Sequence, residues 1–134
     1  MHKDTTYAYL AGLADGDGCF KAQPGGSNGR GRSLHLEIGS RYEPSIDWLI
    51  YNFGGNKTIT TTAQGRPFYR WKGGPNWLRE HLPYFVQYLI EKKTQAEVVL
   101  QLLELKAQSS THARFEPELQ DELLAKLVQL KKDK

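Results

Sequence analysis

The sequence contains one cysteine, one methionine and no long apolar run. Cys19 has no partner for an intrachain disulfide, and the four histidines, His2, His35, His81 and His112, are too scattered to indicate a zinc site. No apolar stretch approaches the roughly 18 to 20 residues that a membrane span needs, and the first residues lack the cationic and apolar regions of a signal peptide. We therefore expect a soluble, intracellular protein with no membrane partner and no small-molecule cofactor.

Size and charge narrow the class further. A chain of 134 residues with 39% hydrophobic residues is expected to form a single domain, residues 1–134, with a modest core. The net charge is +3, and its distribution is uneven: eight Lys or Arg against three acids from Gly18 to Lys72, but eight of each sign from 91 to 134. This excess suggests a surface for a polyanion, although a merely solvated basic surface gives the same pattern.

Apolar periodicity predicts alternating helices and strands. Helices are predicted around Leu10, from Pro44 through Phe53, and through most of the chain after residue 75. Strands with period-two alternation are predicted at 19–23, 33–41, 56–62 and 66–72. This order predicts an α+β fold with one four-stranded antiparallel sheet whose apolar face is covered by helices.

The alternation also divides the strand residues between two faces. The inward set is Phe20, Ala22, Leu34, Leu36, Ile38, Ile59, Pro67, Tyr69 and Trp71. The other face stays open and carries most of the excess positive charge. Its candidate contacts to nucleic acid are Lys21, Gln23, His35, Glu37, Arg41, Thr58, Thr60, Thr62, Arg66, Phe68, Arg70 and Lys72, with Asn28, Arg30 and Arg32 from the loop between the first two strands.

The stretch LAGLADGDG, residues 10–18, carries the most specific signal. The glycines at 16 and 18 are expected to end the first helix, and two carboxylates at a helix C-terminus are each disfavoured by about 0.3 to 1 kcal/mol. A positive species is therefore expected nearby. The stretch resembles the LAGLIDADG motif of homing endonucleases and differs from it only at Ala14 and Gly16. The stretch LPYFVQYLIEKKTQAEVVL and the order of elements resemble the same family, so the resemblance covers nearly the whole chain.

The resemblance implies a homodimer that binds double-stranded DNA with a four-stranded antiparallel saddle backed by helices. In this family the motif helices of two subunits pack side by side, and the residues implied at that interface are Leu10, Gly12, Leu13 and Gly16. Gly12 and Gly16 are four residues apart, so they share a helix stripe that another backbone can approach closely. The alternative is a marginal helix packed inside one subunit, since glycine within a helix costs about 1 kcal/mol.

The resemblance also implies a hydrolytic site that uses Mg²⁺. Asp17 is the implied catalytic metal ligand, assisted by the backbone carbonyl of Gly16, and the ion activates a water and stabilises the leaving 3′ oxygen. Asp15 is expected to act as a cap that hydrogen-bonds local backbone. Lys92 aligns with a lysine that the family places near the scissile phosphate. A shift of the alignment by one position would place Lys93 there instead. Either lysine can also be a solvated residue at the start of a helix.

One departure from the family keeps three hypotheses open. Tyr42 and Ile46 stand where dimeric members have a Gln and an Arg that complete the catalytic pocket, and Arg41 or Glu43 can compensate. The first hypothesis is a homing endonuclease that cuts a pseudo-palindromic site, and Asp17 favours it. The second is a catalytically impaired DNA-binding protein, which Tyr42 and Ile46 favour. The third is an intron RNA maturase that uses the same surface on RNA.

Overall fold

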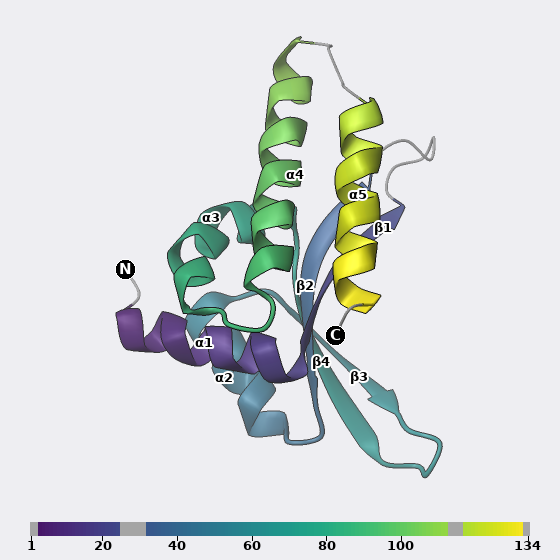
Figure 1. The fold of residues 1–134 in the computed structure, drawn as a ribbon. Coiled ribbons are helices and arrows are strands. Elements are labelled where there is room, and N and C mark those ends of the chain that lie inside the picture. The colour runs from purple at the N-terminus through teal and green to yellow at the C-terminus, as the bar shows by residue number, and fades with distance from the viewer. Residues whose placement is uncertain (1–2, 25–31, 113–116, 133–134) are drawn as a thin grey trace.

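The structure, a computed structural model, describes residues 3–24, 32–112 and 117–132 (Figure 1). Its elements in chain order are α1 (Asp4–Asp17), β1 (Gly18–Pro24), β2 (Arg32–Ser40), α2 (Glu43–Phe53), β3 (Asn56–Thr61), β4 (Pro67–Gly73), α3 (Pro75–Phe85), a short 3₁₀ helix η1 (Val86–Tyr88), α4 (Lys93–His112) and α5 (Pro117–Lys132). The predicted α+β class and the predicted order of elements are confirmed. Within the described ranges, no helix is both long and apolar enough to cross a membrane.

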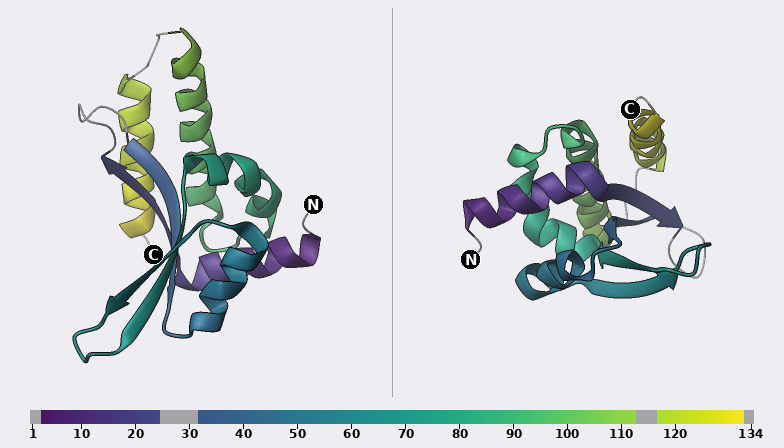
Figure 2. Two further views of the ribbon diagram at one scale, coloured as in Figure 1. Left: turned by 180° about the vertical axis from the view of Figure 1, so that it is seen from behind. Right: turned by 90° about the horizontal axis from the view of Figure 1, so that it is seen from below.

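The four strands form one antiparallel sheet in the order β1-β2-β4-β3. In its register Lys21 lies opposite His35, and Glu37 lies opposite Lys72. Helices α1, α3 and α4 pack against β1 and β2 and lie to one side of the sheet (Figure 2). The predicted sheet, with helices on its apolar face, is therefore confirmed, and its second face remains available for a partner.

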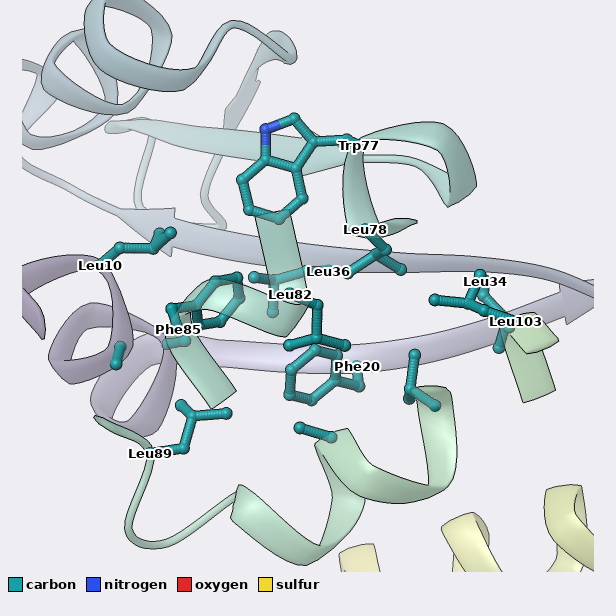
Figure 3. Packing of buried hydrophobic residues seen from close by; sticks show 14 of the residues in the cluster. Leu10, Phe20, Leu34, Leu36, Trp77, Leu78, Leu82, Phe85, Leu89 and Leu103 are labelled. Atoms are coloured by element: carbon teal, nitrogen blue, oxygen red, sulfur yellow. The ribbon is translucent and has the colours of Figure 1, made fainter. Parts of the chain in front are cut away.

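The core lies between the sheet and these helices. Phe20 and Leu36 project from the strands toward Leu82 and Phe85 of α3, and Leu34 lies beside Leu103 of α4 (Figure 3). All six side chains are buried. Burying a side chain of this size contributes about 1.5 to 3 kcal/mol relative to exposure. Period-two alternation therefore identified the buried face of the two strands that the helices cover.

The hairpin β3–β4 departs from that expectation. Ile59 lies on the predicted inner face but is 60% exposed, and the residues of β3 are exposed almost throughout. The reason is geometric: the end of the hairpin extends beyond the helices (Figure 1), and α2 and α3 pack against β4. Period-two alternation of apolar residues predicts burial only where helices cover that face of the strand.

The end of α2 is fixed against the sheet by tryptophans. Gly54 and Gly55 have φ values of 69° and 90°, which favour glycine. The indole Nε1 of Trp71 donates to the Gly54 carbonyl at 2.7 Å, and Nε1 of Trp77 donates to the Phe53 carbonyl at 3.0 Å. A Cβ on Gly55 would lie 2.5 Å from the Trp71 indole nitrogen. These contacts hold α2 against β4 and α3.

Candidate metal site and nucleic-acid interface

The motif helix runs further than expected. Helix α1 continues through Gly16 to Asp17, and the N–H of Gly18 closes it by donating to the Ala14 carbonyl. Gly16 therefore lies inside the last turn instead of ending the helix, which corrects the prediction. Asp17 is exposed at the point where α1 passes into β1.

The other carboxylate of the motif is used internally. Asp15 accepts hydrogen bonds from the backbone N–H groups of Ile90 at 2.8 Å and Lys92 at 3.0 Å. Asp15 is therefore a cap, as predicted, but its partners precede α4 and are not local, which corrects the prediction. Both carboxylate oxygens of Asp15 are engaged in this way, so Asp17 is the motif carboxylate that faces solvent.

Lys92 is buried beside the same turn. The residue is 3% exposed, and its Nζ donates to the backbone carbonyl of Asp15 at 2.6 Å. Lys93, in contrast, is exposed at the first residue of α4. A solvated helix start therefore describes Lys93 and not Lys92. The Lys92 ammonium stabilises the C-terminal end of α1, where unpaired carbonyls and the helix dipole favour a cation.

A hollow of about 480 Å³ opens on the uncovered face of the sheet next to Asp17. Its walls are Asp17, Cys19, Lys21, Glu37, Gly39, Ser40, Arg41, Phe68 and Arg70. Six of these had been singled out from the sequence. Cys19, Gly39 and Ser40 had not, although period-two alternation of the strands places Cys19 on the same face as Lys21. We call this set the hollow below.

Charges within the hollow are paired across strands. Lys21 forms a salt bridge with Glu37, and Nη1 of Arg70 lies 3.9 Å from Glu37 Oε1. Partial burial raises the pKa of Glu37, but the hydrogen bond from Lys21 and the charges of Lys21 and Arg70 lower it by more, so the pKa falls below its usual value. An ionised Glu37 therefore balances Lys21, and the arginines give the hollow its positive character.

The remaining predicted contacts are spread along the open face. Thr58, Thr60, Arg66 and Lys72 are exposed on β3, β4 and their connection, and Thr62 accepts a hydrogen bond from the backbone N–H of Arg66 at 3.1 Å. Gln23 and Arg32 lie in the paired ends of β1 and β2. Asn28 and Arg30 lie outside the described residues.

His35 does not behave as an exposed contact. It stands on the open face opposite Lys21, but it is 2% exposed, and its Nε2 has no hydrogen-bond partner in the described part of the chain. Burial lowers the pKa of His35, and the charges of Lys72, Lys21 and Lys131 lower it further, partly opposed by Glu37. We therefore remove His35 from the set of direct nucleic-acid contacts.

The lowered pKa of His35 predicts that acid destabilises the fold. Below pH of about 6.5 the unfolded chain protonates this histidine while the folded chain resists, so the free energy of unfolding falls as pH decreases, by up to about 1.4 kcal/mol per pH unit. His35→Gln is expected to reduce that slope. The measurement is urea unfolding of the parent and the variant at several pH values from 7.5 to 5. Parallel slopes for the two proteins would contradict the assignment.

The outer stripe of α1 is open and small. Tyr7, Leu10, Ala11 and Ala14 are buried against the chain's own core, whereas Thr5, Ala8, Tyr9, Gly12 and Gly16 are exposed. A Cβ on Gly12 or Gly16 would meet no atom of the described part of the chain within 4 Å. Leu10 is fully buried, so its side chain cannot face a second subunit and we drop it from the proposed interface. Leu13 is half-buried and is retained.

The two positions that depart from the family pattern lie away from Asp17. Ile46 is completely buried in α2, and Tyr42 is 67% exposed in a separate hollow beside Tyr9. Glu43 is bound to Lys57 at 2.5 Å. Of the two residues considered as compensation, Arg41 is the one that shares the hollow with Asp17.

The donor set of one chain is small. Within residues 3–24, 32–112 and 117–132, no cluster of three or more His, Cys, Asp or Glu side chains is placed to hold a metal. The end of α1 supplies the carboxylate of Asp17 and the carbonyl of Gly16. Hard oxygen donors in low number suit Mg²⁺, which keeps several waters and binds phosphate oxygens.

Comparison with known proteins places the fold. No family model matches the sequence, and a search of curated proteins finds no match. The homing endonuclease I-CvuI in complex with its target matches with a TM-score of 0.70 and 22% identity over 95% of this chain and 82% of that one. The archaeal intron-encoded homing endonuclease I-Vdi141I complexed with DNA matches with a TM-score of 0.64 and 16% identity over 98% and 83%.

A third match differs in length. The meganuclease I-SmaMI bound to uncleavable DNA gives a TM-score of 0.64 and 22% identity over 94% of this chain but only 43% of that one. At these identities the likeness establishes the fold. The chain has the LAGLIDADG homing endonuclease fold, as the motif implied.

Proposed function

We propose that the protein is a sequence-specific double-strand DNA endonuclease that acts as a homodimer with a divalent cation. One observation carries the proposal: the exposed carboxylate of Asp17 opens into a basic hollow on the uncovered face of the sheet. A carboxylate at a helix C-terminus beside a polyanion-binding surface is unfavourable unless a cation joins them. The solved structures with this fold, among them I-CvuI with its target, support the assignment.

The sheet provides the reading surface. Strand β2 has nine residues, and at about 3.3 Å per residue it spans about 30 Å, close to nine base pairs at roughly 3.4 Å each. The open face fits the major groove, where donors and acceptors of all four base pairs can be distinguished. Two such faces read a pseudo-palindrome of about twenty base pairs.

The residues at the end of α1 have separate tasks. Asp17 and the Gly16 carbonyl hold Mg²⁺, which supplies a Lewis acid for the phosphate and an activated water when bound. Arg41 shares the hollow with Asp17 and is the cation we assign to the charge that develops on the scissile phosphate. Lys92 is buried and donates to the Asp15 carbonyl, so we propose that it positions the last turn of α1 and does not contact the phosphate directly.

The dimer follows from the need to cut both strands. One chain contributes one exposed motif carboxylate, and this chain spans 43% of I-SmaMI. Among the described residues, none requires Gly12 or Gly16 to lack a side chain, because none lies within 4 Å of a Cβ built at either position. Close approach of a second α1 explains both glycines, which otherwise weaken the helix by about 1 kcal/mol each.

The second candidate function is DNA binding by the same surface without DNA cleavage. The burial of Ile46 and the outward position of Tyr42 favour it, because neither residue supplies a polar group to the hollow. A catalytically impaired DNA-binding protein and the endonuclease differ in one measurable property, cleavage in the presence of Mg²⁺.

The test starts from duplexes selected by the protein itself. A randomised duplex pool is bound in EDTA, and the enriched site is placed in a plasmid and incubated with Mg²⁺ or with EDTA. We expect a pseudo-palindromic site of about twenty base pairs and cutting of both strands with Mg²⁺ alone. Binding without cutting would support the second candidate. Failure to enrich any duplex, with tighter binding to structured intron RNA at matched salt, would support the maturase hypothesis.

A further inference from the structure

An aromatic ring lies against a glycine on the open face. The Phe68 ring sits over Gly39 so closely that a Cβ there would be 2.6 and 2.7 Å from ring atoms Cε2 and Cζ. Gly39 is not among the described glycines with positive φ, so its backbone conformation does not require glycine. The position instead uses the missing side chain, because the ring occupies the space that a Cβ would take.

The same ring supports an arginine. The guanidinium carbon of Arg70 lies 5.0 Å from the Phe68 ring centroid, which is the range of a cation–π contact. Nη1 of the same guanidinium lies 3.9 Å from Glu37 Oε1. Arg70 pairs with Gly39 on β2 and with Thr58 on β3, so it stands over the middle of the sheet. Its side chain is 43% exposed, so it is accessible to a partner on this face.

We propose that Gly39 is a positioning residue for base recognition: by seating Phe68 it orients Arg70 to contact a guanine. The inference rests on the proposed DNA-reading function. Guanidinium is a rigid fork of donors with no acceptor, and in the major groove guanine presents two acceptors, N7 and O6, side by side. A guanidinium that already contacts a ring and a carboxylate loses less rotational freedom on binding, so its contact with guanine discriminates more strongly.

The prediction is a loss of preference at one symmetric pair of positions. Gly39→Ala displaces the far end of the Phe68 side chain, so the fold survives while Arg70 loses its support. A bidentate arginine–guanine contact discriminates by about 5- to 150-fold, and we expect Gly39→Ala to remove at least fivefold of it. Arg70→Lys is expected to lose preference at the same positions, since an ammonium cannot form the fork.

The measurement is competitive binding in EDTA to the site that the parent selects and to a panel of duplexes, each altered at one symmetric pair. Gly74→Ala is the matched control, because a Cβ there meets no described residue within 4 Å and Gly74 precedes α3. It is expected to keep the parental profile. Thermal unfolding is measured alongside, and the midpoint of Gly39→Ala is expected within a few degrees of the parent.

A double-mutant cycle isolates the route through the ring. If Gly39 acts through Phe68, adding Gly39→Ala to Phe68→Ala changes nothing further. An unchanged profile for Gly39→Ala, a uniform loss at all positions, or an additional loss in the Phe68→Ala background would each overturn the inference while leaving the endonuclease proposal intact. A parent that enriches no duplex at all would instead overturn the proposed function, and this inference with it.

Discussion

Gly12→Gln is expected to separate the proposed dimer into folded monomers. Gly12 lies on the exposed stripe of α1 with open space around it, so a glutamine fits each chain by itself. Gln favours the helix over Gly by about 0.5 to 1 kcal/mol, so each monomer is expected to be at least as stable. Between two close helices, however, each inserted glutamine destabilises the dimer by about 1 to 3 kcal/mol. The two-fold axis places one glutamine from each subunit at the interface, which doubles this cost. The dimer is expected to weaken by about thirtyfold or more.

Sedimentation at micromolar concentration measures this effect. The parent is expected at the mass of two chains and Gly12→Gln at 15.3 kDa, the mass of one. Ala125→Gln places the same side chain on an exposed position of α5 and is expected to remain dimeric. Binding to a full site is expected to fall with the dimer. A parent that sediments as one chain, or a variant that stays dimeric, would contradict the proposed interface.

The sequence was most informative where local physics decides the outcome. Alternation of apolar residues identified the buried face of β1 and β2, because helices cover that face and exclude water from Phe20 and Leu36. It misjudged Ile59, which obeys the same alternation but lies in a hairpin whose end extends beyond the helices. Periodicity reports the direction of a side chain, whereas burial depends on what is packed above it.

Long-range contacts were the part that local patterns could not supply. Asp15 was identified as a cap, yet its partners Ile90 and Lys92 are 75 and 77 residues away. Lys92, which the resemblance predicts near a phosphate, is buried beside Asp15. The strand position of His35 predicts the open face, but the side chain is buried. In each case the residue type was informative and its surroundings were set by tertiary packing.

The two motif carboxylates have different surroundings, so substitution of each one is expected to affect the protein differently. Asp15 accepts two backbone hydrogen bonds from the segment that precedes α4. Its substitution therefore disturbs the contact of α1 with that segment as well as any catalysis. Asp17 is exposed at the rim of the hollow, and within the described residues no hydrogen bond or ion pair of its side chain is found. Asp17 can therefore be changed with little effect on the fold, which makes it the informative position.

Asp17→Asn is expected to abolish cleavage and to preserve binding. The substitution removes a negative charge and hardly changes volume, so the fold, the dimer and the reading face are expected to persist. Loss of a charged metal ligand is expected to lower the cleavage rate by at least about a hundredfold. Binding in EDTA is expected to be unchanged or tighter, because a carboxylate no longer repels the nearby phosphates.

The experiment compares plasmid cutting with Mg²⁺ and gel-shift affinity in EDTA for the parent, Asp17→Asn and Asp121→Asn on the selected site. Asp121 is exposed on α5, so it controls for the loss of one negative charge and is expected to leave both properties at parental levels. A variant at Asp17 that still cuts at the parental rate would show that another carboxylate holds the ion. A parent that binds and never cuts would identify a DNA-binding protein that lost its chemistry, because Ile46 is buried and Tyr42 faces away from the hollow. The combination of abolished cutting and retained affinity at Asp17 alone distinguishes a metal ligand from a residue that merely supports the fold.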